Sequence, residues 1–443
     1  MTLSPLDSIN GAVASGEQMH GWVRDLFPIC RSLTGPGVRD TLAYLGHLLP
    51  ELQVESVPSH TRAFDWSVPD EWTIRDAYVA DECGRRVIDF RAHNLHVVGY
   101  SVPVDRWLTL DELQAHLHSR PDLPEAIPYV TSYYKRQWGF CLSETARQRL
   151  TPGRYRAVID SDLKPGVMNY AQAVLSGRST REVLISTYIC HPSMANNELS
   201  GPAVVTALGR WLRTVSPRKY TYRLVYVPET IGAIAYIAQH LDHLKAATIA
   251  GFQVTCIGDD RAYSYLPSRH GNTLADQVAL HVLRHLAPAF RRFAYHDRCS
   301  DERQYCAPGV DLPVVSMMRS KYHEFPEYHT SLDDLSLVTP EGLAGGLLVM
   351  RRAIEALEAN IRPIYTVLCE PQLGKRGLYP DLSTVGSSAS VAAMMDILAY
   401  SDGTRTLLDI AELIGLPIYD VAPIVKRLLA HDLLADADFV ANS

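Results

Sequence analysis

Four short segments of this 443-residue chain carry side chains that bind metals or move protons. In the first, at 185–201, an apolar run leads to His191, and a polar turn then carries Asn196, Asn197 and Glu198. Imidazole nitrogen and carboxylate oxygen are ligands that suit zinc. Because a histidine at the end of a strand is more often a structural residue, this segment alone does no more than suggest a metal site.

The second segment follows the apolar run 222–227, where Pro228 precedes Glu229. A carboxylate in such partly apolar surroundings has a raised pKa and can act as a general base toward water. The alternative interpretation is that Glu229 lies in the first turn of a helix and complements the helix dipole.

Two charged loops complete the set. The loop 322–334 carries His323, Glu324, Tyr328 and His329, and polar side chains have little structural reason to gather there, so we expect His329 to be functional. A solvated charged surface is the alternative for the loop at 299–305. That loop contains Asp301, Glu302 and Arg303.

The elements that must position these residues form an α/β pattern. From about residue 154 the sequence repeats strand, turn and helix, which is typical of a mostly parallel mixed sheet flanked by helices. The expected strands are 155–160, 183–189, 222–227, 248–257 and 312–318, and the expected helices are 202–215, 273–286 and 341–360. Ligands bind at the carboxyl ends of the strands of such sheets, so we expect the segments to meet there.

The preceding residues divide into two parts. Residues 8–58 have helical spacing of their apolar side chains, followed by a short strand at 53–57. Residues 61–150 are rich in Trp, Tyr, Pro and Asp, with alternating runs at 86–90 and 93–100, which indicates a small strand-rich inserted domain. We therefore predict a catalytic domain made of 1–60 and 151–362, interrupted by the insert at 61–150.

The last part of the chain, 363–443, is predicted to be a winged-helix domain. After a linker at 363–390 come three amphipathic helical patterns at 394–400, 406–414 and 418–429, with a Gly-containing turn between the last two. Residues 364–443 contain 5 basic and 10 acidic side chains, a balance of −5. Because a nucleic-acid surface is basic, we expect this domain to contact protein or to form a homo-oligomer instead.

Composition excludes several classes of protein. The chain has 42 basic and 49 acidic side chains, so its net charge of −7 provides no general attraction for nucleic acid. No apolar stretch approaches the ~20 residues of a membrane-spanning helix, so we expect no membrane contact. The 8 cysteines are scattered, and residues 1–27 lack the pattern of a signal peptide, so a cytoplasmic protein with reduced thiols is expected.

A further pair of histidines is a weaker candidate. His281 and His285 have the i, i+4 spacing of a metalloprotease helix, but Val282 stands where such a helix has its glutamate. No third ligand is evident, so we predict no metal site at this pair.

Taken together, the four segments resemble the zinc aminopeptidase clan that also contains the glutaminyl cyclases. Along nearly its whole length the chain is similar to a bacterial family of aminopeptidase-like proteins with a small inserted domain and a C-terminal winged helix. The motifs that carry this resemblance are at 64–72, 94–96, 128–142 and 300–305, besides the segments above. The resemblance implies that His191 and His329 are metal ligands and that Glu229 activates water.

Three positions depart from the pattern of the clan. Asn197 stands where the clan has a metal-bridging Asp, Thr230 where a second Glu binds a second zinc, and Thr255 where a further Asp ligand is usual. An amide is a poor zinc ligand, so we infer one zinc ion, held by His191, His329 and Glu198. Whether residue 197 or 198 contacts the metal stays open at this point.

The expected activity is hydrolysis of an amide or peptide bond in a small substrate by zinc-activated water, with Glu229 as the general base. A non-catalytic binding or regulatory protein is one alternative, and acyl transfer or cyclisation on the same fold is another.

The expected substrate contacts have several origins. Tyr133 and Tyr134 belong to the motif at 128–142 and would form a pocket wall. Arg269 and Arg303 could clamp a carboxylate, although a structural salt bridge is equally consistent with either. The remaining predicted contacts are Asp301, Glu302 or Glu324, as partners of a substrate amino group, and His323 and Tyr328.

Overall fold

The structure, a computed structural model, describes residues 13–378 and 385–437. The remaining parts of the predicted N-terminal helical segment, the linker and the C-terminus lie outside the described residues. The chain divides into two units. The first contains the described residues up to Asp276 together with Phe290–Leu348, and the second contains Gln277–Ala289 and the described residues from Val349 onward.

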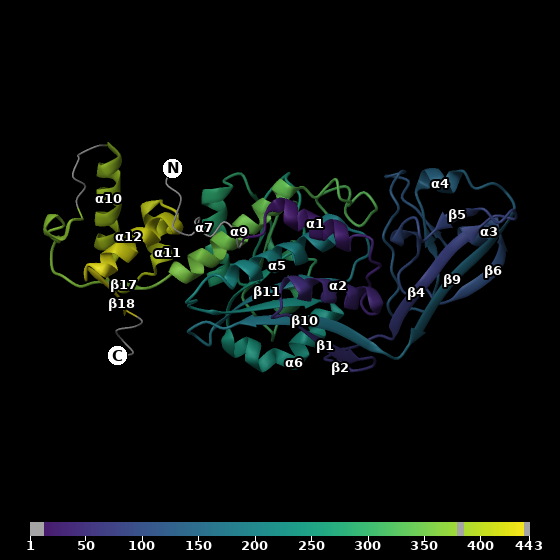
Figure 1. The fold of residues 1–443 in the computed structure, drawn as a ribbon, viewed down its shortest axis with the longest axis horizontal. Helices are drawn as coiled ribbons and strands as arrows, with labels where there is room; N and C mark the ends of the chain where they lie inside the picture. Colours follow the sequence, from purple (N-terminus) through teal and green to yellow (C-terminus); the bar gives the residue numbers. More distant parts are fainter. Residues whose placement is uncertain (1–12, 379–384, 438–443) are drawn as a thin grey trace. The chain divides into compact units, whose positions relative to one another are not determined.

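An eight-stranded mixed sheet forms the centre of the first unit (Figure 1). Its strands, in spatial order, are β1 (Gln53–Pro58), β10 (Val167–Leu175), β12 (Thr221–Val227), β11 (Glu182–Tyr188), β13 (Thr248–Gln253), β16 (Val314–Met318), β14 (Ser264–Leu266) and β15 (Arg291–Arg292). The four strands β12, β11, β13 and β16 run parallel, and β10 and β14 run antiparallel beside them. Every residue of β11, β12 and β16 is buried, as expected for strands covered on both faces.

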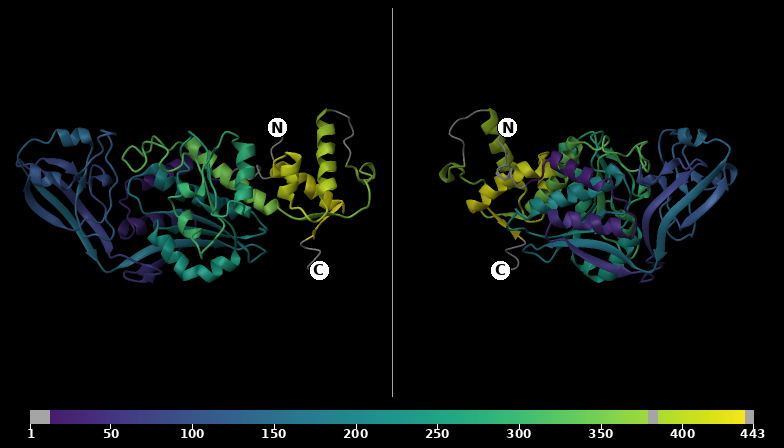
Figure 2. Two further views of the ribbon diagram at one scale, coloured as in Figure 1. Left: turned by 180° about the vertical axis from the view of Figure 1, so that it is seen from behind. Right: turned by 45° about the vertical axis from the view of Figure 1, so that its right-hand side comes forward.

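Helices lie on both faces of this sheet (Figures 1 and 2). On one face are α1 (Gly16–Leu26), α2 (Pro36–Leu48) and α5 (Ser200–Leu212), and on the other is α6 (Ile231–Ala247). Successive side chains of a strand point to opposite faces of the sheet, so alternate residues face the two helical layers. The Tyr226 hydroxyl is 2.9 Å from that of Thr206 on α5, whereas Val225 packs in the apolar cluster that includes α6.

The other helical segments of the first unit connect the strands of the sheet. They include η3 (Ala195–Leu199), η4 (Tyr295–Asp297) and α8 (Glu302–Tyr305), while α7 (Leu274–Leu286) and α9 (Pro340–Ala359) extend beyond this unit. The predicted helices at 202–215, 273–286 and 341–360 are confirmed as α5, α7 and α9 with shifts of a few residues at their ends. The predicted strand 248–257 ends earlier, at Gln253.

The inserted segment forms a second, antiparallel sheet of four strands. These are β5 (Arg86–Asp89), β4 (Glu71–Ala80), β9 (Arg154–Lys164) and β6 (Val104–Thr109), in that spatial order. Around them are β2 (Arg62–Ala63), β3 (Trp66–Ser67), η2 (Asn94–His96), α3 (Leu110–Gln114), β7 (Leu117–His118), β8 (Phe140–Cys141) and α4 (Glu144–Gln148).

Two expectations about these strands are wrong. Residues 155–160 do not join the central sheet but lie in β9, which pairs with β4 and β6. Buried and partly exposed residues alternate along β9, which suits a sheet with one solvated face. Residues 93–100 are not a strand, because the His93 side chain accepts the Leu95 N–H and starts the helical turn η2.

The second unit contains the winged helix. Its elements are β17 (Pro363–Tyr365), η5 (Gly374–Arg376), α10 (Val385–Tyr400), α11 (Leu407–Ile414), α12 (Ile418–Ala430) and β18 (Leu434–Asp436), with β17 and β18 antiparallel. A capping box at Thr406 begins α11, and Gly415 ends it with φ of 69°. The positive φ explains why a glycine stands between α11 and α12.

His281 of α7 also belongs to this second unit. Its Nδ1 is 2.7 Å from Glu412 Oε1, and its Nε2 accepts the Ile418 N–H at 2.8 Å. Both ring nitrogens therefore have partners. The structure also brings Glu412 to the two histidines, so that potential ligand atoms of His281, His285 and Glu412 lie within 4.8 Å of one another, and the sequence showed no such third ligand.

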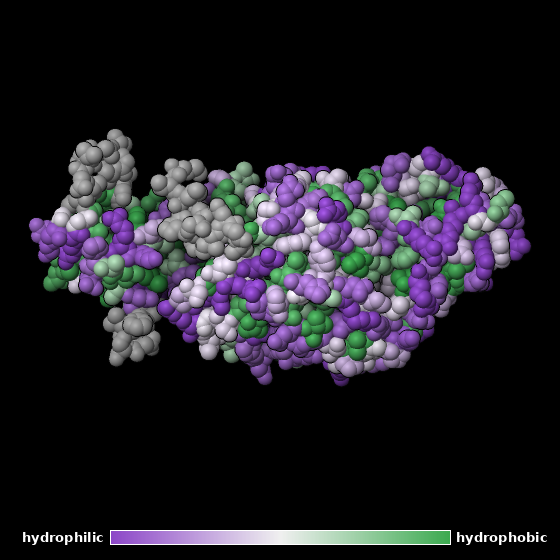
Figure 3. Space-filling model, in the orientation of Figure 1, coloured by the Kyte–Doolittle hydropathy of each residue, from purple (hydrophilic) through white to green (hydrophobic). Residues whose placement is uncertain are grey.

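Two surface properties bear on function. Among the described residues no helix combines the length and the apolar character that crossing a membrane requires. On the face shown in Figure 3, hydrophilic residues are widespread and hydrophobic residues are scattered among them.

Candidate active site

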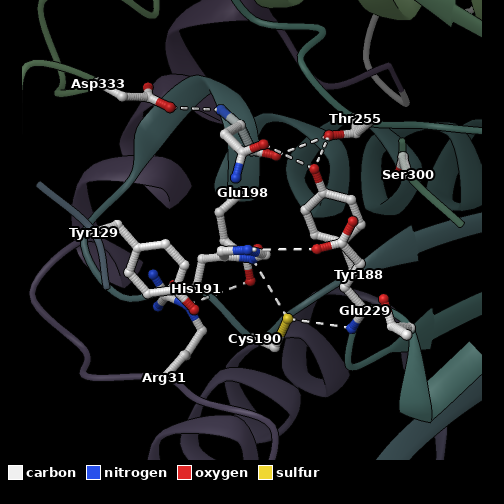
Figure 4. Close-up of polar contacts among 12 residues, drawn as sticks. Arg31, Tyr129, Tyr188, Cys190, His191, Glu198, Glu229, Thr255, Ser300 and Asp333 are labelled. Carbon is white, nitrogen blue, oxygen red and sulfur yellow. Dashed lines mark hydrogen bonds and ion pairs between the residues drawn. The ribbon is translucent and has the colours of Figure 1, made fainter. Parts of the chain in front are cut away.

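The carboxyl end of β11 places His191 at the centre of a buried polar cluster (Figure 4). His191 Nδ1 is 2.8 Å from Glu198 Oε2, and His191 Nε2 is 3.5 Å from Glu229 Oε2. Glu198 comes from the π-helical turn η3 that precedes α5, and Glu229 follows the last residues of β12. The two carboxylates thus approach opposite nitrogens of one imidazole.

Hydrogen bonds hold the turn that carries Glu198. Both carboxylate oxygens of Asp333 accept backbone N–H groups, that of Asn196 at 2.6 Å and that of Asn197 at 2.8 Å. Arg31 is fully buried, donates through Nε to the His191 carbonyl at 3.0 Å, and has the same nitrogen 3.8 Å from Glu198 Oε1. The guanidinium charge compensates the buried carboxylate of Glu198.

The ring of His329 lies beside that of His191. The two ring centroids are 5.3 Å apart with an interplanar angle of 42°. Tyr129 packs against both rings, at 5.1 Å from His191 and 5.2 Å from His329, and its N–H donates to the His329 carbonyl at 2.9 Å. Tyr328 stacks on His329 at 3.9 Å.

Cys190, His191 and Glu198 bring potential metal-ligand atoms within 4.8 Å of one another, and the ring of His329 lies next to this group. The His329 Nε2 atom is buried and has no hydrogen-bond partner among the described residues. Two imidazoles that share a zinc ion at ~2.1 Å from each nitrogen have centroids roughly 5 Å apart, which matches the observed spacing. Burial and the neighbouring His191 hold the pKa of His329 well below its ordinary value, which favours the neutral ring that a metal ligand requires. The pKa of His191 is shifted in the opposite direction.

Burial and neighbouring groups shift the pKa of His191 in opposite directions. Burial works to lower the pKa of this imidazole, but Cys190 and Glu198 act against burial and raise it well above the ordinary value. A carboxylate on Nδ1 fixes the orientation of a ring whose other nitrogen is available to a metal.

Glu229 differs from Glu198 in its exposure to solvent. The side chain of Glu229 is 21% exposed, whereas that of Glu198 is 0% exposed. Burial raises the pKa of Glu229, opposed by His191 and Arg303. A partly accessible carboxylate with a raised pKa is the better general base of the two.

The backbone after Glu229 is strained. Thr230 has φ of 64°, which is unfavourable for a β-branched residue. Its N–H donates to Asp301 Oδ1 at 2.8 Å, and its hydroxyl accepts from Arg303 at 2.9 Å. Such conformations persist where surrounding contacts enforce them, and they concentrate at functional sites.

Two of the three positions that depart from the zinc aminopeptidase pattern, Asn197 and Thr255, are hydrogen-bonded to each other, and Thr230 has different partners. The Asn197 Oδ1 accepts from the Tyr188 hydroxyl at 2.9 Å, and Thr255 donates to the Asn197 carbonyl at 2.8 Å. Thr230 presents a hydroxyl to Arg303. Amide and hydroxyl groups are poor zinc ligands, so these positions fit a second metal badly.

A pocket adjoins Glu229 and has mostly apolar walls. It is lined by Leu33, Trp66, Tyr133, Tyr134, Cys190, Glu229, Thr230 and Ile231. The Tyr133 hydroxyl is 2.7 Å from that of Tyr129, and the exposed Tyr134 donates to the Ser67 carbonyl at 2.8 Å. The structure therefore brings both predicted tyrosines to a wall of this pocket.

The other predicted substrate contacts lie in different places. Asp301 accepts the backbone N–H of Thr230 and keeps its Oδ2 buried without a hydrogen-bond partner among the residues that the structure describes. Arg269 pairs with Asp311 and lines a second pocket together with Arg303. The exposed His323 packs its ring on Tyr328 and has Nε2 3.3 Å from Cys299 Sγ.

Glu302 and Glu324 do not face the centre. The two oxygens of Glu302 accept from the N–H groups of Cys299 and Ser300 and from the hydroxyls of Tyr322 and Ser316, which gives Glu302 a structural role. Glu324 is exposed and forms an ion pair of 3.9 Å with the exposed Arg291.

Sequence reasoning missed four residues of the site, namely Arg31, Tyr129, Tyr188 and Asp333. Tyr129 lies within the motif at 128–142, so the motif marked the segment but not the residue that touches both histidines. Arg31 gave no such signal, because an isolated arginine in a helical segment is ordinarily a surface residue.

Comparison with known proteins identifies the family of the chain. A family model described as a domain of unknown function (DUF4910) matches residues 20–360, and a winged helix-turn-helix model matches residues 362–436. A Clostridium acetobutylicum protein is 40% identical over 431 residues, which are 96% of this chain and 98% of that protein. It is provisionally described as a polysaccharide biosynthesis protein with an aminopeptidase-like domain.

Solved structures show the same fold. The crystal structure of a provisionally named peptidase from Clostridium acetobutylicum has a TM-score of 0.91 at 38% identity, covering 97% of this chain and 100% of that one. A zinc aminopeptidase from Bacillus subtilis has a TM-score of 0.54 at 12% identity, covering 77% of this chain and 95% of that one. The chain therefore belongs to the DUF4910 family, and it combines an aminopeptidase-like α/β fold with a C-terminal winged helix.

Proposed function

We propose that this protein is a zinc-dependent hydrolase that cleaves an amide or peptide bond in a small substrate. The observation that carries the proposal is the pairing of His191 and His329 at 5.3 Å beside the partly exposed Glu229. His191, through Nε2, and His329 would hold the metal, Glu198 would hold His191 through Nδ1, and Glu229 would act as the general base.

A zinc ion, when bound, supplies Lewis acidity that polarises a carbonyl group and lowers the pKa of water. Glu229 takes a proton from the attacking water, whose oxygen forms a bond to the carbonyl carbon of the substrate. Glu229 then passes that proton to the nitrogen as the carbon–nitrogen bond breaks, which yields an acid and an amine. Tyr129 holds the two imidazole rings in place, and Glu198 fixes the orientation of His191.

The proposed substrate is a small molecule that contains an amide bond, either a short peptide or an acyl or aminoacyl derivative. The pocket beside Glu229 has aromatic walls formed by Trp66, Tyr133 and Tyr134, which suit an apolar side chain or the face of a sugar ring. The description of the Clostridium acetobutylicum relative names polysaccharide biosynthesis, which supports including N-acylated amino sugars among the candidates.

The experiment is metal analysis combined with an amide-hydrolysis screen. Protein purified without a nickel column is expected to contain zinc and to hydrolyse some aminoacyl anilides, dipeptides or N-acyl amino sugars. The summed mass of the two products should exceed the mass of the substrate by one water. His329→Ala should lose both zinc and activity. His296→Ala, which changes a histidine with an 83% exposed side chain, is the matched control and should keep both.

Three results would contradict the proposal. Full activity in excess chelator would exclude zinc chemistry. A product that lacks the added water would indicate acyl transfer or cyclisation, and stoichiometric zinc without turnover of any amide would favour a binding protein.

A further inference from the structure

A second pocket adjoins the one beside Glu229, and its lining is basic. The two pockets share Trp66 and Thr230, and the second is lined by Arg269, Arg298 and Arg303 with no carboxylate among its lining residues. This concentration of positive charge is unusual in a chain whose net charge is −7.

The three arginines differ in how far their charge is already compensated. Arg269 forms an ion pair with Asp311. Arg298 lies over the ring of Tyr295, with its guanidinium carbon 4.6 Å from the centroid, and its polar contact is a long one of 3.4 Å to the Tyr295 carbonyl. In the part of the chain that the structure describes, Arg298 makes no ion pair.

Arg303 points most directly to a ligand. It donates to the Thr230 hydroxyl at 2.9 Å, but its Nε is buried and has no hydrogen-bond partner among the described residues. A buried guanidinium N–H without an acceptor costs free energy, which a bound acceptor would recover. Because Thr230 directly follows Glu229, such an acceptor would lie next to the reacting amide.

We propose that the substrate carries an anionic group, a carboxylate or a phosphate, close to the amide that is cleaved, and that Arg303 and Arg298 bind it. The inference rests on the proposed function, because it assumes that Glu229 marks the reacting end of the substrate. A guanidinium binds either oxyanion through parallel N–H donors, so the two groups share the chemistry of recognition. Trp66 would cover the substrate where the apolar pocket meets the basic one.

The test measures binding rather than turnover. Glu229→Gln protein, with and without added zinc, is titrated calorimetrically with C-terminally amidated dipeptides. Each dipeptide contains Leu and one of Asp, Asn, phosphoserine or Ser, and both orders of the two residues are tested. We expect the Asp or the phosphoserine peptide to bind about tenfold tighter than its neutral counterpart, as charge-assisted hydrogen bonds are the stronger kind. Comparison of the two acidic peptides identifies the oxyanion.

Variants locate the interaction. Arg298→Gln and Arg303→Gln should each bring the ratio of acidic-peptide to neutral-peptide affinity close to one, and it is this ratio that reports the anion contact whatever happens to the affinity for the neutral peptide alone. Arg292→Gln, an exposed arginine of β15 outside both pockets, is the matched control. Because Arg298 is also exposed, its substitution leaves the fold intact, which unchanged thermal unfolding would verify.

The two proposals fail in different ways. Equal binding of acidic and neutral peptides, or a loss no greater in Arg298→Gln than in Arg292→Gln, overturns the anion pocket but leaves hydrolysis of neutral amides possible. Selective binding of the acidic peptide with no hydrolysis by the zinc-loaded wild type sustains the pocket and contradicts the proposed function.

Discussion

At the scale of single residues, one imidazole separates the roles of two carboxylates. Glu198 contacts Nδ1 of His191 in a fully buried position, whereas Glu229 approaches Nε2 and is 21% exposed. The same chemical group is therefore fixed against the imidazole at one position and partly open to solvent at the other. The environment, rather than the residue type, assigns the roles.

The two carboxylates should respond differently to the same substitution. Glu229→Gln is expected to lower kcat about 10²–10⁴-fold, the usual contribution of a general base, while zinc remains bound. Glu198→Gln should weaken zinc binding at least about tenfold, because the amide holds the Nδ1–H of His191 less strongly than the carboxylate does. Zinc titration and steady-state kinetics on both variants check the assignment. A Glu229→Gln protein that loses zinc and keeps its residual rate would reverse it.

Asn197 offers a second test at this scale. Its Nδ2 is buried with no hydrogen-bond partner among the described residues, while its Oδ1 accepts from Tyr188. Asn197→Asp would bury a carboxylate oxygen without a donor, so the metal-free variant should unfold at a lower temperature than the wild type. Added zinc should then raise its melting temperature more than that of the wild type. A variant that melts like the wild type with and without zinc would place residue 197 away from the metal.

The sequence predicted the chemical residues better than the residues that support them. His191, Glu229 and His329 follow core strands, and the parallel sheet brings such positions to one edge. The supporting residues are the buried Arg31, Tyr129 in the insert and Asp333 in the loop 322–334. No periodicity in the sequence marks any of them. Their roles depend on long-range contacts that are not encoded in local spacing.

At the scale of elements, the difference between continuous and alternating hydrophobicity decided which strands were placed correctly. The strands β11 and β12 are buried throughout, so their unbroken apolar runs mark them as central. The strand β9 alternates, which predicts a sheet with a solvated face, and it joins the insert accordingly. The expectation at 155–160 is wrong because it follows the order of the segments along the chain, in which these residues precede the central strands, and not the alternation of their side chains.

The start of α5 shows how an element positions the site. A Cβ atom at Gly201 would overlap Thr187 Oγ1 and the Val254 carbonyl, so only glycine lets the helix begin this close to the strand ends. Gly201→Ala should therefore lower the free energy of unfolding by about 1–3 kcal/mol and, by displacing η3, weaken zinc binding.

A matched glycine provides the control for that prediction. A Cβ at Gly46 in α2 meets nothing within 4 Å, so Gly46→Ala should stabilise the protein by about 0.5–1 kcal/mol and leave zinc binding unchanged. Chemical denaturation and zinc titration of the two variants measure both effects. If Gly201→Ala bound zinc as the wild type does, α5 would not control the position of Glu198.

At the scale of the whole molecule, the chain has two units, each with its own buried apolar residues. Proteins of this kind need not unfold in one step, so we expect calorimetry to resolve two transitions. The second unit contains a group that makes one of these transitions depend on pH, namely His281.

Burial lowers the pKa of His281 in the folded state, despite the hydrogen bond to Glu412, and Arg284 and His285 lie nearby. Protonation would also place a hydrogen on Nε2, which accepts the Ile418 N–H. The unfolded chain binds this proton near pH ~6.5 and the folded unit does not, so the contribution to stability is full above that pH and is lost as pH falls below it. The transition of the second unit should therefore move to lower temperature between pH 7.5 and 5.5.

His281→Gln should remove much of this pH dependence and lower stability by about 1–2 kcal/mol at neutral pH, because the Ile418 N–H loses its acceptor. His285→Gln, on the same helix, should retain the dependence. Calorimetric scans of the two variants across this pH range separate the contribution of one buried imidazole from that of the 17 histidines as a whole. An unchanged slope in His281→Gln would mean that other groups govern the pH response of the second unit.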